Sequence, residues 1–199
     1  MIEMRIIGIT GNSGSGKSTV SKMISENYEA KVIDADKIAK KMTKNNGEYL
    51  QAIRQAFGED VIKNNELDRK KLADIVFSNK TEKEKLDSLT FEYVVIRIKE
   101  KIKKAQIKSD IKYIVLDVPL LFESKLNEVC NYTIGVTAPK IEKIKRICKR
   151  DKLSKEKALQ RLNSQPDDEF FIQQCDFIIE NINNEKTEEK VNEIMLKLQ

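Results

Sequence analysis

Short runs of apolar and β-branched residues alternate with amphipathic segments along most of this chain. Five buried strands are predicted from the runs Met4–Thr10, Ala30–Asp34, Tyr113–Asp117, Tyr132–Val136 and Phe177–Glu180. Most intervals between these runs carry apolar residues at helical spacing, as at Val20, Met23 and Ile24 in a helix expected from about Lys17. Because helical crossovers join parallel strands, the predicted class is α/β.

The interval between Asp36 and Tyr113 is longer than one crossover needs and carries only helical patterns. Three helices are predicted in it, marked by residues 50, 53 and 57, by residues 72, 75 and 76, and by a stripe between about Glu82 and Ile107. A capping box, Thr81-x-x-Glu84, opens the third helix. Its apolar stripe comprises Leu86, Leu89, Tyr93, Ile96 and Ile102. We expect a helical insertion over the carboxyl edge of the sheet, where parallel α/β sheets bind their ligands.

The last third of the chain carries three further helix signals. Pro139 stands where a helix begins, and Ile141, Ile144 and Ile147 continue the pattern. Ser154 can cap a short helix that Pro166 closes off. A final amphipathic helix is expected from Thr187, with Val191, Ile194 and Leu198 facing inward.

Composition excludes several kinds of chemistry. The 199 residues include no histidine, so a Ser-His-Asp unit and imidazole metal sites are excluded, and a general base must be a carboxylate, a lysine or water. The first apolar run is too short to span a membrane and no cleavage site follows it, so we expect a cytoplasmic protein without a membrane partner. An odd count of 3 cysteines favours reduced thiols. The sequence sets no oligomeric state and is compatible with a monomer.

The net charge of +5 is carried mostly by lysines, many of them clustered on predicted helices. Two interpretations are open: a solvated helix face that also attracts a phosphorylated substrate, or a platform for nucleic acid. The cluster Lys99–Lys104 alternates with Glu100 and Ile102, which favours the first interpretation. We therefore expect a small-molecule substrate and no nucleic acid.

A complete P-loop pattern, G-x-x-x-x-G-K-S/T, lies between the first predicted strand and the helix after it. The alternative is a glycine-rich loop that only turns the chain and has no role in binding phosphate. In a P-loop, glycines allow backbone N–H groups to turn toward phosphate oxygens, the lysine reaches the β- and γ-phosphates, and the hydroxyl ligates Mg²⁺. The predicted ATP-binding residues are Gly11, Asn12, Ser13, Gly14, Ser15, Gly16, Lys17, Ser18 and Thr19, with Ser18 also a Mg²⁺ ligand.

Carboxylates follow two other predicted strands. Asp34 and Asp36 are spaced as i and i+2, so on a strand both face the same side, and one can accept the proton of an acceptor hydroxyl. The alternative is that they cap the next helix. Asp117 ends the strand YIVLD, where a magnesium-binding aspartate is expected, unless it only terminates the strand. Kinase chemistry is therefore favoured over a GTPase switch, because the chain lacks a guanine-reading Asn-Lys-x-Asp motif after a strand. It is favoured over a nucleic-acid motor because the sequence has no ladder of aromatic and basic residues for stacking single strands.

In these segments the chain resembles the dephospho-coenzyme A kinase family. The matching strings are IIGITGNSGSGKSTV, VIDADKIA, LDVPLLFE, RICKRDKLSKEKALQRLNSQ and CDFIIEN, which follow one another along nearly the whole chain. The resemblance implies a P-loop kinase core with a five-stranded parallel sheet of order 2-3-1-4-5, a helical acceptor-binding insertion and a helical lid. On this basis we expect a core of residues 1–42 and 108–199, with the lid at about 140–167 and the insertion at 43–107.

The resemblance also implies the reaction, transfer of the γ-phosphoryl group of ATP, with Mg²⁺, to the ribose 3′-hydroxyl of dephospho-CoA. Another kinase for a nucleoside or nucleotide is the alternative. The implied catalytic residues are Asp36, Lys17, Arg146 and Arg150, and Asn181 falls at the adenine. The implied substrate-binding residues are Asp34, Lys40, Leu120, Glu123 and Arg161, and Gln165 matches the end of the lid. The lid arginines can equally be ordinary surface charge, and Asn181 an ordinary turn residue.

Two departures from the family pattern lie on the acceptor side. The family usually has Thr-His-Pro where this chain reads Thr90-Phe91-Glu92. It usually has arginine at the position of Lys40, and a lysine cannot grip a phosphate with two parallel hydrogen bonds. These departures bear on acceptor identity and affinity, and they leave the ATP side unchanged.

Overall fold

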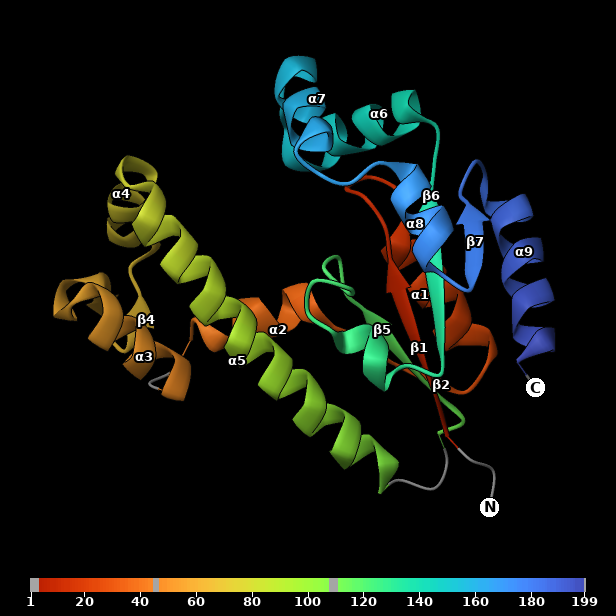
Figure 1. The fold of residues 1–199 in the computed structure, drawn as a ribbon, viewed down its shortest axis with the longest axis horizontal. Helices are drawn as coiled ribbons and strands as arrows, with labels where there is room; N and C mark the ends of the chain where they lie inside the picture. Colours follow the sequence, from red (N-terminus) through yellow and green to blue (C-terminus); the bar gives the residue numbers. More distant parts are fainter. Residues whose placement is uncertain (1–3, 45–46, 108–110, 199) are drawn as a thin grey trace. The chain divides into compact units, whose positions relative to one another are not determined.

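The computed structural model describes residues 4–44, 47–107 and 111–198. The chain forms two compact units, one of Met1–Ile33 with Ala105–Gln199 and one of Asp34–Lys104 (Figure 1). Within the described ranges, no helix is both long enough and apolar enough to cross a membrane.

The first unit contains a five-stranded sheet, in the order β2-β5-β1-β6-β7. Its strands are β1 (Arg5–Thr10), β2 (Ala30–Asp34), β5 (Tyr113–Asp117), β6 (Tyr132–Thr137) and β7 (Phe177–Glu180). Strand β1 pairs in parallel with β5 and β6, and β6 pairs in parallel with β7. When these strands are numbered along the chain as 1 to 5, the order is 2-3-1-4-5, so the expected α/β fold is confirmed.

Helices cover this sheet on both faces, which explains why its strands read as almost unbroken apolar runs. On one face, α1 (Lys17–Asn27) and α9 (Asn184–Lys197) pack on a core that includes Ile7, Ile9 and Val136, each 0% exposed. On the other face, η2 (Leu126–Val129) contacts β1, and α8 (Asp168–Gln174) contacts β6 and β7. At Gly8 there is no room for a larger residue, since an added Cβ would lie 2.8 Å from the Cys130 sulfur.

Beyond the end of β6 the chain forms the helical pair α6 (Lys140–Asp151) and α7 (Lys155–Asn163), which pack against each other (Figure 1). Their shared core consists of Ile147, Ala158 and Leu162. Ser154 caps α7 by accepting a hydrogen bond from the backbone N–H of Lys157 at 3.4 Å, as expected from the sequence.

The second unit is mostly helical and has a core of its own. Its elements are α2 (Ala35–Met42), α3 (Glu48–Phe57), η1 (Glu59–Val61), β3 (Ile62–Lys63), β4 (Glu66–Leu67), α4 (Arg69–Ser78) and most of α5 (Lys80–Gln106). Leu50, Ile53 and Val61 are each fully buried at its centre. The predicted domain boundaries stay a prediction, as does the acceptor-binding role of this segment.

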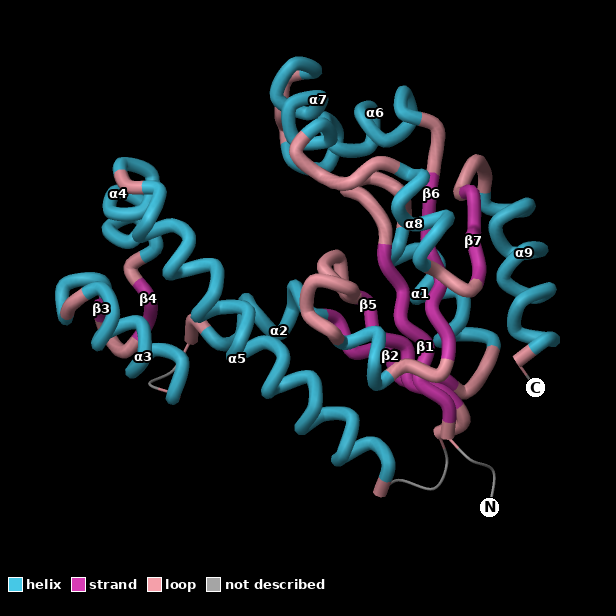
Figure 2. The backbone as a smooth tube through the Cα atoms, in the orientation of Figure 1, coloured by secondary structure: helices cyan, strands magenta, loops and turns pink. Residues whose placement is uncertain are grey.

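The expectation of only helices between Asp36 and Tyr113 is wrong, because β3 and β4 form a short antiparallel hairpin there (Figure 2). Asn64 and Asn65 connect these strands with φ of 52° and 60°. A two-residue hairpin turn needs positive φ at both positions, and asparagine tolerates that conformation better than most residues.

Two helix starts differ from the sequence prediction, and one helix was not predicted. The capping box at Thr81 is not the cap of α5, because Asn79 Oδ1 accepts from the backbone N–H groups of Thr81 and Glu82 at 2.9 and 3.3 Å. Helix α9 begins at Asn184 rather than Thr187, capped by Asn183, whose Oδ1 accepts from Lys186 N at 2.9 Å. Helix α8 was not predicted at all. Within α5, Ile96 is 41% exposed, so it lies outside the buried stripe.

The cysteines are free thiols, as the odd count predicts. Burial raises the pKa of Cys130 and of Cys175 to about 12, and the nearby Asp176 carboxylate adds to the effect at both. Since only the thiolate is a good nucleophile, these two side chains remain neutral and unreactive near pH 7.

Candidate active site

The loop between β1 and α1 has the backbone of a phosphate-binding nest. Gly11, Gly14 and Gly16 have φ of 140°, 78° and 100°, a region that residues with a side chain rarely adopt. Space also requires glycine, since a Cβ at Gly11 would collide with the Val136 carbonyl oxygen and one at Gly16 with the Asn181 amide. A backbone of this kind turns N–H groups toward phosphate oxygens, and here it leads directly into α1.

Lys17 folds back over this loop. Its Nζ donates to the carbonyl oxygens of Gly11 at 2.7 Å and Asn12 at 3.2 Å, which holds the ammonium group over the nest. Ser18 and Thr19 follow in the first turn of α1, and both are exposed. Placed this way, the three residues surround the amino end of α1, where the helix dipole favours an anion.

Two polar atoms of the loop are buried without a partner among the described residues, Asn12 Oδ1 and Ser15 Oγ. Their residues are 4% and 0% exposed. Buried polar atoms are nearly always hydrogen-bonded in native proteins. The loop thus has hydrogen-bonding capacity left over for a ligand or a water molecule.

Arg146 and Asn181 hold the backbone of the loop in place through hydrogen bonds. Arg146 Nη1 donates to the carbonyl oxygens of Gly14 and Ser15 at 3.2 and 3.1 Å, and its Nη2 donates to Asn181 O at 3.0 Å. The Asn181 amide donates to Ser15 O at 2.8 Å. Both side chains thereby use hydrogen bonds to shape the loop. Their expected contacts with phosphate and adenine stay predictions.

The end of the expected lid is tied to the same loop. Asn12 Nδ2 donates to Pro166 O at 2.9 Å, and the backbone N–H of Ser13 donates to Gln165 Oε1 at 2.9 Å. Nearby, Lys143 is only 5% exposed and its Nζ bonds both carboxylate oxygens of Asp168 at 2.7 and 2.8 Å.

Sequence reasoning missed the Lys143–Asp168 pair. The only available signal was a lysine on the apolar side of α6, one residue before Ile144, and lysines on that helix are otherwise exposed. The pair joins α6 to α8 beside a cavity of about 400 Å³ that Asn12, Gln165 and Pro166 help to line.

Arg150 and Arg161 meet at one carboxylate. Arg150 Nε and Nη2 bond Asp151 at 2.8 Å each, and Arg161 Nη1 bonds Asp151 Oδ2 at 2.6 Å. The hydrogen bond from Arg150, followed by the charges of both arginines, holds the pKa of Asp151 below its ordinary value. Asp151 therefore stays ionised. It holds the exposed guanidinium groups of Arg150 and Arg161 together, and this connects α6 to α7.

Asp117 lies at the carboxyl end of β5 and is 6% exposed. Its Oδ2 accepts a hydrogen bond from Ser21 Oγ at 3.1 Å, which connects it to α1. Leu120 and Glu123 follow in the turn after β5, and both are exposed, Leu120 by 49%. An apolar side chain this exposed beside the carboxyl ends of strands is available to a ligand.

Asp34, Asp36 and Lys40 belong to the second unit. The expectation that the two aspartates share one face of a strand is wrong, because the helix α2 begins at Ala35. Asp34 is its N-cap, with Oδ1 accepting from Lys37 N at 2.9 Å, so the capping alternative holds for this residue. Asp36 is exposed in the first turn of α2, and Lys40 lies one turn later on the same helix face.

Oxygen atoms dominate the candidate metal ligands. Ser18 offers a hydroxyl and Asp117 a carboxylate, and these are the ligand types that Mg²⁺ prefers. Among the described residues no cluster of three or more His, Cys, Asp or Glu side chains is arranged to hold a metal ion. This donor set fits Mg²⁺, which is usually held by one or two protein oxygens together with substrate phosphates.

Comparison with known proteins agrees with this arrangement. The family model described as dephospho-CoA kinase matches residues 5–188. A dephospho-CoA kinase of Fusobacterium nucleatum is 41% identical over 184 residues, which is 92% of each chain. The solved structure of dephospho-CoA kinase from Campylobacter jejuni has a TM-score of 0.70 at 33% identity, and that of TT1252 from Thermus thermophilus has 0.80 at 28%; each comparison covers 98% of both chains. This chain therefore belongs to the dephospho-CoA kinase family.

Proposed function

We propose that this protein transfers the γ-phosphoryl group of ATP to the ribose 3′-hydroxyl of dephospho-CoA, which yields coenzyme A and ADP. The observation that carries this proposal is a complete phosphate-binding loop in a chain that matches this family over residues 5–188. The glycines of the loop have positive φ, and the Lys17 ammonium lies over the loop. The free thiols fit a reducing compartment, and we propose the cytoplasm.

The reaction needs a base for the acceptor hydroxyl and positive charge around the transferred group. We assign the base role to Asp36, an exposed carboxylate in a chain without histidine. The 3′-oxygen loses its proton to Asp36 and attacks the γ-phosphorus, while the bond from phosphorus to the β–γ bridging oxygen breaks and ADP leaves. The loop amides and Lys17 hold the phosphates and neutralise charge as it moves to the leaving oxygen.

Mg²⁺ is the metal that we propose for this site, with the Ser18 hydroxyl and the Asp117 carboxylate as the protein groups that hold it. When bound, Mg²⁺ supplies electrostatic stabilisation of the phosphate charges. The Ser21 hydroxyl donates a hydrogen bond to Asp117 Oδ2 and so fixes the orientation of the proposed metal-binding carboxylate.

A panel of acceptors tests the proposed function. Purified protein is incubated with ATP, Mg²⁺ and one acceptor at a time, namely dephospho-CoA, nucleosides and nucleoside monophosphates, and products are identified by mass. We expect turnover of dephospho-CoA to exceed turnover of every other acceptor. The reason is that the family match covers the second unit, which we propose binds the acceptor, as well as the P-loop. Robust phosphorylation of a nucleoside monophosphate with none of dephospho-CoA would refute the proposal.

Replacement of Arg150 with alanine is expected to lower kcat for dephospho-CoA by about 10²-fold or more, because a lid arginine stabilises charge that develops in the transition state. KM should change little, since we expect this contact to form only in the transition state. Steady-state kinetics separate the two parameters. Lys149→Ala, at the exposed neighbour on α6, is the matched control and should retain normal kcat. An effect confined to KM would show instead that Arg150 binds substrate and transition state equally.

A further inference from the structure

The ion pair between Lys143 of α6 and Asp168 of α8 is buried on its lysine side. The Lys143 side chain is 6% exposed, and that of Asp168 is 35% exposed. Lys143 Nζ bonds both carboxylate oxygens, at 2.7 and 2.8 Å. Taking a charge out of water is costly, so a cation this buried depends on its partner. The pair therefore holds the first turn of α6 and the start of α8 in one arrangement.

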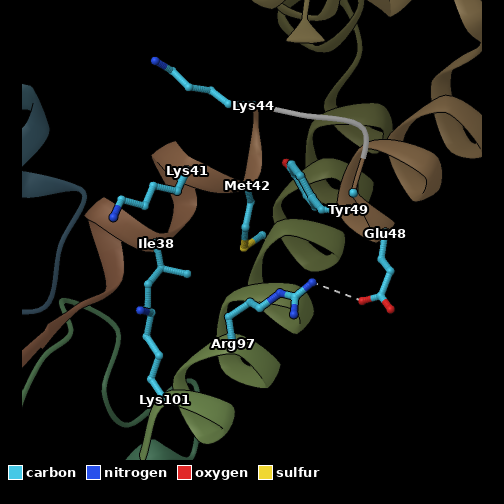
Figure 3. A pocket seen from close by; sticks show the side chains of 9 residues that line it. Ile38, Lys41, Met42, Lys44, Glu48, Tyr49, Arg97 and Lys101 are labelled. Atoms are coloured by element: carbon cyan, nitrogen blue, oxygen red, sulfur yellow. Dashed lines mark hydrogen bonds and ion pairs between the residues drawn. The ribbon is translucent and has the colours of Figure 1, made fainter. Parts of the chain in front are cut away.

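Two exposed ion pairs provide a contrast. Lys145, two residues later on α6, pairs with Glu142 at 2.7 Å, and its side chain is 67% exposed. In a pocket of the second unit, Arg97 pairs with Glu48 at 3.2 Å, the contact that a dashed line marks in Figure 3. The Arg97 side chain is 38% exposed. Exposed pairs of this kind do little to fix a geometry, because water and salt screen them.

The α6 end of the buried pair lies directly against the phosphate-binding loop. A Cβ at Gly14 would lie 2.6 Å from the carbonyl oxygen of Lys143, so the backbones of loop and helix are in contact there. One turn later, Arg146 donates to the carbonyl oxygens of Gly14 and Ser15 at 3.2 and 3.1 Å. Lys143 and Arg146 are spaced as i and i+3, so they share one face of α6. This face is the one turned toward the loop.

The α8 end of the pair leads back to the same loop through residues 165 and 166. Gln165 Oε1 accepts from the backbone N–H of Ser13 at 2.9 Å, and its Nε2 donates to Ser13 Oγ at 3.3 Å. Asn12 Nδ2 donates to Pro166 O at 2.9 Å. Asp168 follows two residues later, as the first residue of α8. The ion pair therefore closes a ring that runs from the loop through α6 and α8 and returns to the loop.

A cavity of about 400 Å³ borders this ring, and its lining includes Asn12, Lys143, Gln165, Pro166 and Asp168. Residues that line a cavity lack packing partners on that side. Residues 165 and 166 therefore depend on the hydrogen bonds and the ion pair for their position more than on close packing. Without the ion pair, they have free space into which they can shift away from the loop.

We propose that Lys143 and Asp168 are positioning residues for ATP, and that their ion pair fixes the shape of the phosphate-binding loop without touching a phosphate. The pair acts through two contacts, that of Gln165 with the Ser13 amide and that of α6 with Gly14. Loop amides bind phosphate best when they are already directed at one centre, so a loosened loop binds ATP less tightly. This inference rests on the proposed function, in which the loop holds the triphosphate of ATP.

Lys143→Met tests the proposal, since methionine is also long and unbranched and carries no charge. In the ligand-free protein, we expect hydrogen exchange of the Ser13 amide to become about 10- to 100-fold faster, which corresponds to the loss of one hydrogen-bonded charge. Calorimetry with a non-hydrolysable ATP analogue and Mg²⁺ should show a dissociation constant raised by about 10-fold, because binding must now order the loop. KM for dephospho-CoA should stay unchanged.

Exchange of the Ile7 amide separates this effect from a loss of overall stability. Ile7 is fully buried in the sheet, so its exchange reports global unfolding, whereas exchange at Ser13 reports local opening of the loop. A pair with a purely structural role would affect Ile7 and leave the ATP affinity of the folded protein at its wild-type value. Lys145→Met is the matched control, since it removes an exposed pair from the same helix and should behave as wild type.

Asp168→Asn removes the charge from the other side of the pair, and thermal unfolding verifies that each variant is folded. Its effects on Ser13 exchange and ATP affinity should have the same direction, so it tests the proposal should Lys143→Met not fold. Wild-type ATP affinity or wild-type Ser13 exchange in a folded variant of either residue would overturn the inference. Failure of the wild type to bind the ATP analogue would count against the proposed function instead, and Ser13 exchange would still test the ion pair.

Discussion

Lys17→Ala is expected to lower turnover by at least about 10²–10³-fold, the loss typical when one preorganised electrostatic contact to the reacting group is removed. The ammonium already lies over the loop, 2.7 Å from Gly11 O, so it needs little rearrangement to reach a triphosphate. We expect weaker binding of ATP as well, because the same charge faces the phosphates of the ground state. Steady-state kinetics together with calorimetric binding of a non-hydrolysable ATP analogue measure both effects.

The fold should survive this substitution, since Lys17 begins α1 at a half-exposed position and alanine is a better helix former. Lys22→Ala on the same helix is the control, because the Lys22 side chain is 71% exposed and forms an ion pair with Glu26 at 3.5 Å on the helix surface. A folded Lys17→Ala protein with wild-type turnover would remove the loop from the reaction.

Asp36→Asn is expected to lower kcat by ~10²–10⁴-fold, the usual contribution of a general base, because the amide cannot take the proton of the acceptor hydroxyl. The substitution is almost isosteric. Affinity for ATP should be retained, which a calorimetric titration of the variant measures alongside its steady-state kinetics.

Asp87→Asn, at an exposed position of α5, serves as the control for loss of a carboxylate in the same unit. The folding cost of Asp36→Asn should be small, since an acidic residue in the first turn of a helix contributes only about 0.3–1 kcal/mol through the dipole. Near-normal turnover of a folded Asp36→Asn protein would remove Asp36 from the base role.

The sheet was predictable mainly because its inner strands β1, β5 and β6 are buried on both faces. Runs such as Tyr113–Asp117 and Phe177–Glu180 are bounded by polar residues, and the structure begins and ends these two strands at the same positions. Burial on both faces requires nearly unbroken apolar sequence, so the pattern is strong even over the five residues of β5. The strand order came from resemblance to a family, since residue spacing alone does not specify which strands are neighbours.

The hairpin and the helix starts were harder because they depend on single polar residues. Asn64-Asn65 is a recognisable turn signal, but strands of two residues on each side are too short to show alternation. At α5 two candidate caps, Asn79 and Thr81, lie two residues apart, and both are residue types that cap helices. Which one caps the helix depends on where α4 ends.

In the site, too, local patterns were predictable and long-range contacts were not. The loop from Gly11 to Ser18 could be found from the sequence, because binding phosphate requires those residue types in that order. The ties of Asn12 to Pro166 and of Asn181 to Ser15 join residues more than 150 positions apart, and no local pattern encodes them. The expectation that Asp34 and Asp36 share one face of a strand was wrong because α2 begins at Ala35, with Asp34 as its N-cap. The base role of Asp36 stays a proposal.

A crystal structure with a non-hydrolysable ATP analogue, Mg²⁺ and dephospho-CoA tests the central claim most directly. The quantity to measure is the distance from the Asp36 carboxylate to the ribose 3′-oxygen of the acceptor. We predict about 2.6–3.2 Å, the reach of a general base, with that oxygen facing a γ-phosphate held by Gly11–Ser18 and Lys17. A loop without triphosphate, or an Asp36 side chain turned away from the acceptor, would contradict the account.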